Sequence, residues 1–424
     1  MGSIRESFAA LSERRFRLLW TGQALSAVGD SLIAVALAFA VLKLTGSATD
    51  LGIVFAANTV PRVVLTLFAG VWADRLPRNL VMRSSDLVRA AAQAFVAVDL
   101  LSGNARVWHL AAAAVVYATA TAFFQPAISG IVPDTVRPEH LQQANALMGL
   151  TRSAVGIAGP GISGVLVATV GAGWVYVIDS ASFLASAVSL TLVTVTAAIA
   201  REQRAGFFRE LAEGWSIVTG RVWLWTNFVG FAVANFCVAA YLVLGPKVAL
   251  DHLGGAAAWG ALSACWASGA VLGSAVSLRY RPGRPLLVCC FLWILNGLQT
   301  LFFAGPAPVV VLAVTAVLGG FGLGLGNTIW TTVLQQQVPR AALSRVTSYD
   351  WMVSLLFMPL GYVLAGPLAD AYGFRATLLA VGGTLVVLTL AIAAVPDVRR
   401  IRLGGGPASA EAVAATARTS SPAA

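Results

Sequence analysis

Three charged side chains lie deep inside long apolar stretches of the sequence, where an unpaired charge is costly. Asp30 lies at the midpoint of the first such stretch, Arg62 near the midpoint of the second, and Arg152 within the fifth. A carboxyl group beside a guanidinium group can take up and release a proton. We therefore predict that Asp30 exchanges a proton and that Arg62 or Arg152 sets its proton affinity. A static ion pair that only fixes helix packing is the alternative.

Other ionisable residues lie nearer the ends of apolar stretches, where we expect contact with interfacial water. They are Asp86, Arg89, Asp99, Asp179 and Asp350. The histidines and cysteines are scattered and lack metal-ligand spacing, so we predict neither a metal site nor another cofactor. They are His109, His140, His252, Cys237, Cys265, Cys289 and Cys290.

The elements that must position these residues are membrane-spanning helices. Of 424 residues, 58% are hydrophobic and only 11% are charged, too few to cover a water-soluble globule of this size. Runs of roughly 18 apolar residues are long enough to cross the hydrocarbon core of a bilayer. They occur at 18–42, 51–72, 80–101, 107–131, 141–168, 174–198, 223–247, 256–278, 285–304, 308–333, 343–368 and 374–395. We therefore predict an all-α protein with twelve transmembrane helices in the lipid bilayer.

One long polar connection divides these helices into two sets of six. The predicted domains are a six-helix bundle at 1–200, a cytoplasmic amphipathic linker at 201–221, a second six-helix bundle at 222–396, and a disordered cytoplasmic tail at 397–424. The linker places Phe208, Leu211, Trp215 and Val218 three or four residues apart on one apolar stripe.

The basic residues indicate which helix ends face the cytoplasm, since Lys and Arg are retained there. Of the 28 basic residues, Lys43, Arg106, Lys247 and Arg375 are the ones in loops on the side opposite the N-terminus. We therefore predict that both termini are cytoplasmic. The net charge of +10 is dispersed among short loops, which argues against nucleic-acid binding because that requires basic residues clustered on one face.

A basic loop, GVWADRLPRN at 70–79, follows the second predicted helix. Gly70 would allow close helix approach, and Asp74, with Arg75 and Arg78 beside it, could face the positive end of a neighbouring helix and hold an inner gate closed. The loop resembles the Gly-x-x-x-Asp-Arg-x-Gly-Arg-basic signature of the major facilitator superfamily, although proline and asparagine replace the second glycine and the last basic residue. An ordinary basic loop is the alternative.

The fifth predicted helix carries a run of small residues around a proline. Gly156, Gly159 and Gly164 permit close packing against another helix, and Pro160 bends the chain, as a hinge would require. The run resembles the Gly-Pro motif of the superfamily's antiporters. Generic small-residue packing is the alternative.

Three further stretches narrow the resemblance: WTGQ from Trp20 with Gly29-Asp30, Pro61-Arg62, and FFRELAEGW at 207–215. Together they are similar to the enterobactin-exporter and macrolide-efflux branch of the superfamily. This resemblance implies the major facilitator fold and a monomeric proton-coupled antiporter that exports drug-like, macrolide or siderophore-like compounds across the bacterial plasma membrane by alternating access. A proton symporter that imports a small metabolite is the alternative, because a fold does not set direction.

A substrate cavity between the two halves would be lined by aromatic and amide side chains suited to amphiphiles. The candidates are Tyr117, Gln125, Asn235, Tyr241, Asn327 and Trp330. Packing between helices, or a place in the lipid interface, is the alternative for each of them.

Two other classes of protein are excluded by missing patterns. Lys43 and Lys247 follow Leu42 and Pro246, whereas the lysine of a phosphate-binding loop follows glycine. Neither a nucleophile with a base nor a His-Glu-x-x-His helix occurs, as a membrane hydrolase would require. We therefore predict a transporter driven by a proton gradient rather than an enzyme or an ATP-driven pump.

Overall fold

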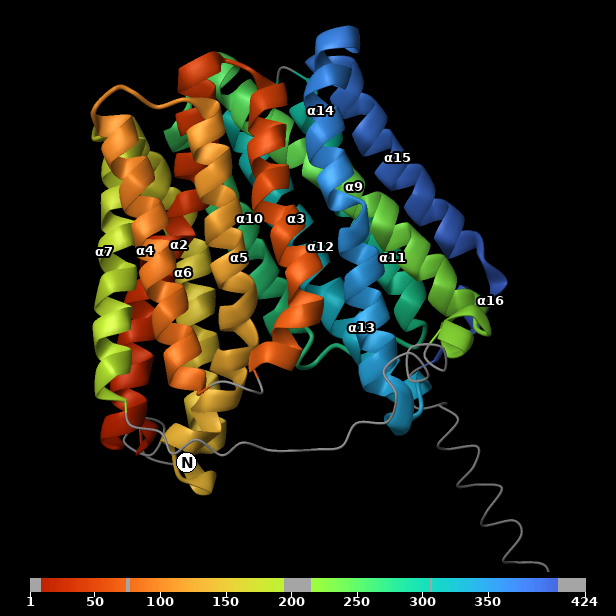
Figure 1. Ribbon diagram of the computed structural model, residues 1–424. Helices are drawn as coiled ribbons and strands as arrows, with labels where there is room; N and C mark the ends of the chain where they lie inside the picture. Colours follow the sequence, from red (N-terminus) through yellow and green to blue (C-terminus); the bar gives the residue numbers. More distant parts are fainter. Residues whose placement is uncertain (1–8, 74–76, 194–214, 306, 403–424) are drawn as a thin grey trace, which may run out of the picture. The chain divides into compact units, whose positions relative to one another are not determined.

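The computed structural model describes residues 9–73, 77–193, 215–305 and 307–402 (Figure 1). These residues are helical, with no strand among them. Eleven helices in this part of the chain are long and apolar enough to cross a membrane. The predicted all-α class is therefore confirmed, while the number of twelve spans and the cytoplasmic termini stay predictions.

The chain divides into two compact units. The first comprises Met1–Glu202, Leu242–Ala264 and Tyr362–Ala371, and the second comprises Gln203–Tyr241, Cys265–Gly361 and Tyr372–Ala424. Of the predicted segments 201–221 and 397–424, only 215–221 and 397–402 fall within the described residues. In the linker, Val218 is buried and Trp215 is exposed.

The first unit is built on six long helices, coloured red to yellow-green in Figure 1. In it α2 packs against α6 and α7, α4 packs against α5 and α7, and α3 packs against α5. The helices are α2 (Arg14–Thr45), α3 (Ala48–Ala73), α4 (Arg78–Leu101), α5 (Val107–Ile131), α6 (Leu141–Thr169) and α7 (Ala172–Leu192), with short 3-10 turns at Ala9–Ser12, Val132–Thr135 and Pro138–His140.

Two glycines make the tight connections between these helices. Gly46 ends α2 with a φ of 67°, a conformation that other residues rarely adopt, and its N–H donates to the Leu42 carbonyl. Gly171, with a φ of 89°, separates α6 from α7 in the same way.

The remaining helices follow the linker. They are α9 (Val222–His252), α10 (Ala256–Val276), α11 (Pro285–Phe303), α12 (Val309–Gln337), α13 (Arg340–Leu356), α14 (Met358–Tyr372), α15 (Phe374–Ala394) and α16 (Pro396–Arg400). Within the second unit, α11 packs against α12 and α15. Its core is rich in aromatic residues, with Phe231 and Trp330 edge to face at 5.0 Å between ring centroids.

The helix predicted at 343–368 is interrupted, since α13 ends at Leu356 and α14 begins at Met358. Pro359 explains the break, because proline lacks a backbone N–H and disfavours the helical conformation of the residue before it. By contrast, Pro160 lies inside the continuous helix α6.

Helix α4 is absent from the eleven candidate spans although it has 24 residues. At 1.5 Å per residue this length suffices for a hydrocarbon layer of about 30 Å. The helix contains Arg83, Asp86, Arg89 and Asp99, which lower its hydropathy. Whether α4 can span the membrane therefore depends on where these charged side chains lie within the first unit.

Candidate functional site

Helices α2 and α7 approach closely because α2 presents glycine where α7 presents polar side chains. A Cβ atom on Gly22 would lie 2.8 Å from the Cβ of Ser189, and a Cβ on Gly29 would lie 2.5 Å from Oδ1 of Asp179. The carboxyl group of Asp179 therefore rests directly against the α2 backbone, one residue before Asp30.

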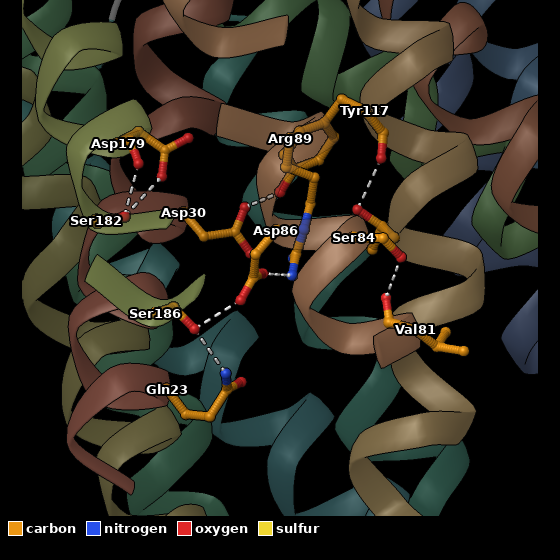
Figure 2. Close-up of polar contacts among 11 residues, drawn as sticks. Gln23, Asp30, Val81, Ser84, Asp86, Arg89, Tyr117, Asp179, Ser182 and Ser186 are labelled. Carbon is orange, nitrogen blue, oxygen red and sulfur yellow. Dashed lines mark hydrogen bonds and ion pairs between the residues drawn. The ribbon is translucent and has the colours of Figure 1, made fainter. Parts of the chain in front are cut away.

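A buried ion pair lies beside this contact (Figure 2). Asp86 and Arg89, one turn apart on α4, are 0% and 3% exposed and form an ion pair. The hydroxyl of Ser186 on α7 donates to Asp86 at 2.7 Å and accepts from the amide of Gln23 at 3.0 Å. The pair is thus connected through one serine to both α7 and α2.

The Arg89 guanidinium is held between two aromatic rings. Its central carbon lies 4.1 Å from the ring centroid of Phe124 and 4.4 Å from that of Phe183. Such stacking favours a cation in a desolvated place. Nε of Arg89 has no hydrogen-bond partner among the described residues.

Asp179 has neutral partners. It is 0% exposed, and it accepts from the Gln93 amide at 2.6 Å and from the Ser182 hydroxyl at 3.4 Å. A buried carboxylate requires compensation by a cation, a metal or a proton. Because Arg89 is already paired with Asp86, a bound proton is the remaining way to neutralise the carboxyl group of Asp179.

Asp30 lies at the edge of the same cluster. Its side chain is exposed, and the hydroxyl of the buried Tyr117 on α5 donates to it. Asp30 interacts electrostatically with both Asp86 and Asp179. We name Asp30, Asp86, Arg89, Tyr117 and Asp179 the carboxyl cluster.

The carboxyl cluster contains more carboxyl groups than cations. Among the described residues it holds three carboxyl groups and one guanidinium. Two negative charges would remain unpaired if all these groups were ionised, which is costly at low dielectric. The cluster is therefore suited to binding and releasing protons.

The proton-exchange role predicted for Asp30 stays a prediction, and the interpretation of Asp86, Arg89 and Asp179 was wrong. These three were expected to contact interfacial water, but they are buried between helices. Distance from a helix end does not say which way a side chain points. A signal was present, since polar residues recur every three or four positions along α4 and α7, which places them on one helix face. They are Asp86, Arg89 and Gln93 on α4 and Asp179, Ser182, Ser186 and Ser189 on α7.

The two arginines predicted to accompany Asp30 are exposed residues. Arg62 on α3 and Arg152 on α6 are both exposed. The guanidinium group in contact with the carboxyl cluster belongs to Arg89.

The gating motif is described only in part. Gly70 lies in the last turn of α3, and Asp74 and Arg75 fall outside the described residues. Arg78 is the first residue of α4 and forms an ion pair with Asp134 at 3.1 Å. This contact joins the connection after α3 to the connection after α5.

A second polar contact ties the start of α2 to the start of α6. Glu13 accepts from the backbone N–H of Arg137 at 3.1 Å and contacts Nδ1 of His140 at 2.7 Å. Burial opposes the charged form of Glu13, but the hydrogen bonds from His140 and Arg137 and the Arg137 charge outweigh it and lower the pKa of this carboxyl.

The small residues of α6 differ in their surroundings. A Cβ on Gly164 would lie 2.5 Å from the Ala256 carbonyl oxygen of α10, and the space of a Cβ on Gly159 is filled by Ser31 of α2. Gly156 faces open space. Close packing thus accounts for Gly159 and Gly164, and Pro160 lies between them.

The predicted substrate residues occupy different environments. Tyr117 and Trp330 are buried, Asn235 and Tyr241 are half-buried, and Gln125 and Asn327 are exposed. Tyr117 belongs to the carboxyl cluster, and Trp330 donates to Asp350 at 3.1 Å within the second unit. The Tyr241 hydroxyl accepts from Gln299 at 3.1 Å.

A small cavity adjoins the carboxyl cluster inside the first unit. Its volume is about 20 Å³, and one water molecule needs about 10–15 Å³. The lining residues come from α2, α3, α4, α5 and α7 and include Asn58, Gln93, Tyr117 and Tyr176. A water there would meet several hydrogen-bonding side chains.

Comparisons with known proteins show the family to which the chain belongs. The sequence profile of the Major Facilitator Superfamily matches residues 19–361. The multidrug efflux pump Tap of Mycolicibacterium fortuitum is 29% identical over 395 residues, which cover 89% of this chain and 95% of the pump. Macrolide efflux protein A of Streptococcus pyogenes is 22% identical over 397 residues, which cover 92% of this chain and 98% of that protein.

Solved structures show the same fold. The nucleoside transporter NupG has a TM-score of 0.70 at 15% identity, covering 89% of this chain and 98% of its own. A bacterial homologue of the iron transporter ferroportin, in an inward-facing state, has a TM-score of 0.69 at 17% identity, covering 90% and 99%. The profile spans most of the sequence and the fold agrees, which confirms the resemblance found in the motifs. The chain belongs to the Major Facilitator Superfamily, as a multi-pass transporter of the plasma membrane and not an enzyme.

Proposed function

We propose that this transporter is a proton-coupled antiporter that exports small amphiphilic compounds, such as drugs, macrolides or siderophore-like molecules, by alternating access. The observation that carries the proposal is the carboxyl cluster, in which carboxyl groups outnumber cations inside a transmembrane bundle. The direction of transport is supported by relatives named as efflux pumps.

In this mechanism Asp30 is the group that exchanges protons with solvent. It is the exposed carboxyl of the cluster, and its hydrogen bond from Tyr117 holds it at the bundle edge. When Asp30 is ionised, Arg89 can share its charge between Asp30 and Asp86. When Asp30 is protonated, Arg89 remains with Asp86 alone. The roles predicted for Arg62 and Arg152 stay predictions.

The proposed topology has twelve spans in two six-helix bundles, with both termini cytoplasmic. Helix α4 is the twelfth span, because its length suffices and its central charges Asp86 and Arg89 pair with each other inside the bundle instead of facing lipid. We propose a monomer whose partners are the bilayer and a small-molecule substrate, with a proton gradient as its energy source.

The substrate residues remain the six proposed from the sequence. The exposed amides of Gln125 and Asn327 and the half-buried Asn235 and Tyr241 would supply hydrogen bonds. Tyr117 would link substrate binding to Asp30, and Trp330 would support neighbouring aromatic rings from the core.

The test uses everted membrane vesicles and radiolabelled erythromycin as the probe. With an acid-inside pH gradient imposed, an antiporter accumulates erythromycin, and the Asp30→Asn variant loses accumulation. The control is Asp370→Asn, a carboxyl on α14 without contacts to the cluster among the described residues, which should accumulate normally. Unchanged proton-driven accumulation in Asp30→Asn would overturn the proposed coupling site.

The alternative, a proton symporter that imports a small metabolite, predicts the opposite direction. Its substrate would leave everted vesicles on acidification of the lumen instead of accumulating. Erythromycin accumulation that persists after nigericin abolishes the pH gradient would exclude proton coupling altogether.

A further inference from the structure

One face of α4 carries a line of buried polar groups that extends beyond the carboxyl cluster. Asp86, Arg89 and Gln93 are followed by the apolar Val96 and then by Asp99, at intervals of three or four residues, and all five residues are buried. From Gln93 to Asp99 is six residues, or about 9 Å along a helix. The line therefore connects the cluster with the end of the bundle where α4 and α5 join.

At that end Asp99 is paired with a histidine. Oδ2 of Asp99 lies 2.6 Å from Nδ1 of His109, the third residue of α5, and their side chains are 10% and 16% exposed. The rings of Phe95 and Trp108 contact the imidazole, with centroids 5.8 and 3.9 Å away. The imidazole and the carboxyl group both carry atoms that can bind and release a proton, and they lie where α4 ends and α5 begins.

The small cavity is lined by neighbours of this pair and by a hydrogen-bond partner of Asp179. It is lined by Val96, one turn from Asp99, and by Leu110, next to His109. On its other side it reaches Gln93, whose amide donates to Asp179. An apolar layer of one valine and one leucine thus separates the surface pair from a space that can hold a water molecule.

We propose that Asp179 is a second proton-binding site, distinct from Asp30, and that protons reach it inside the first unit through this cavity from the Asp99–His109 end. A proton leaves a hydronium ion at the surface pair, crosses the cavity water, and bonds to a carboxylate oxygen of Asp179. The carboxylate becomes a neutral acid, and water remains. This proposal rests on the proposed proton coupling and adds a second carboxyl group and its access route.

The groups around Asp179 define what its proton would control. Asp30 on α2, Arg89 on α4 and Tyr117 on α5 interact electrostatically with it, and Tyr176 lies one turn away on α7 itself. A charged Asp179 would attract Arg89 away from Asp86. Because Asp179 also rests on the backbone of Gly29, the same change would press on α2 next to Asp30.

The test is infrared spectroscopy of the purified full chain in liposomes, which needs no substrate. A protonated carboxyl group has a C=O stretching band separate from the amide bands, and this band shifts when its proton is replaced by deuterium. At neutral pH we expect a band that is present in the unaltered protein and in Asp30→Asn but missing in Asp179→Asn. A band of equal intensity in Asp179→Asn would overturn the assignment.

The route is tested by the rate at which the band shifts after transfer into D2O. Ala114 lines the cavity, so Ala114→Val places two methyl groups in the water's space and should slow the shift by about tenfold or more. Ala112→Val adds the same groups on an exposed position of α5 and should leave the rate unchanged. Equal rates in the two variants would overturn the route.

These readouts are independent of transport. If Asp179→Asn does not fold, the Ala114→Val and Ala112→Val pair still decides the access route. Loss of the band in Asp179→Asn without proton-driven erythromycin transport in the unaltered protein would reject the proposed function and keep the proton site. Proton-driven transport by the unaltered protein, together with an unchanged band in Asp179→Asn, would keep the proposed function and reject the proton site.

Discussion

Replacing Arg89 by methionine should be among the most destabilising single changes in the first unit. Methionine keeps an unbranched chain between Phe124 and Phe183 but removes the cation of the Asp86 ion pair, whose side chains are 4% and 0% exposed. Breaking a buried ion pair from one side costs about 3–5 kcal/mol. Protonation of Asp86 limits the cost, because neutralising an ordinary carboxyl group at pH 7 takes about 4 kcal/mol.

The ion pair also predicts how a second substitution behaves. Asp86→Asn alone should cost less than Arg89→Met, because the Arg89 charge still interacts with the carboxyl group of Asp179. The double variant removes both charges and should recover most of the loss, with a coupling energy of at least about 2 kcal/mol. The loss in Arg89→Met should shrink by up to ~1.4 kcal/mol for each pH unit below 7.

Unfolding by sodium dodecyl sulfate in mixed micelles, followed by far-ultraviolet circular dichroism, measures these differences. Arg152→Met on the exposed face of α6 is the control and should change the free energy of unfolding by less than about 0.5 kcal/mol. The buried ion pair of Asp86 and Arg89 would be refuted by additive effects of the two single changes. It would also be refuted if Arg89→Met lost no more free energy of unfolding than the control.

Two other changes test the packing and the electrostatics of the first unit. Gly29→Ala should lower the free energy of unfolding by about 1–3 kcal/mol, because its Cβ would lie 2.5 Å from the Asp179 carboxyl. Gly156 on α6 faces open space, so Gly156→Ala should be neutral or stabilising in the same sodium dodecyl sulfate titration. Glu13→Gln should lower stability at neutral pH, because the lowered pKa of Glu13 means that its charged form stabilises the fold above its unfolded pKa. As pH falls through the lowered folded pKa, that contribution is lost. The free energies of unfolding of Glu13→Gln and the unaltered protein, plotted against pH, should therefore converge in acid. A constant difference between them would contradict the His140 contact as its cause.

The sequence predicted most of the helical framework, but it did not predict that Asp86, Arg89 and Asp179 are buried together. Apolar length locates helices well, as at 107–131, where the structure has Val107–Ile131, because a bilayer allows little else to cross it. It failed at Pro359, where the helix is interrupted. The depth of a residue along its own helix singled out Asp30. Whether Asp86, Arg89 and Asp179 face each other depends on how α2, α4 and α7 are rotated and packed. The pattern of a single helix does not contain that information.

The burial of the network follows from a constraint shared by these three helices. A carboxyl or guanidinium group facing lipid is costly, so polar residues repeated on one face oblige that face to turn toward other polar faces. Gly29 then brings α2 against Asp179, leaving Asp30 on the exposed side and Asp179 on the enclosed side of the same contact. Of two carboxyl groups that interact electrostatically, one is therefore exposed and the other enclosed, and a proton gained by one changes the charge that the other faces. In the proposed mechanism, proton binding at either position alters how α2 packs against α7, and this couples the proton to the change between conformations.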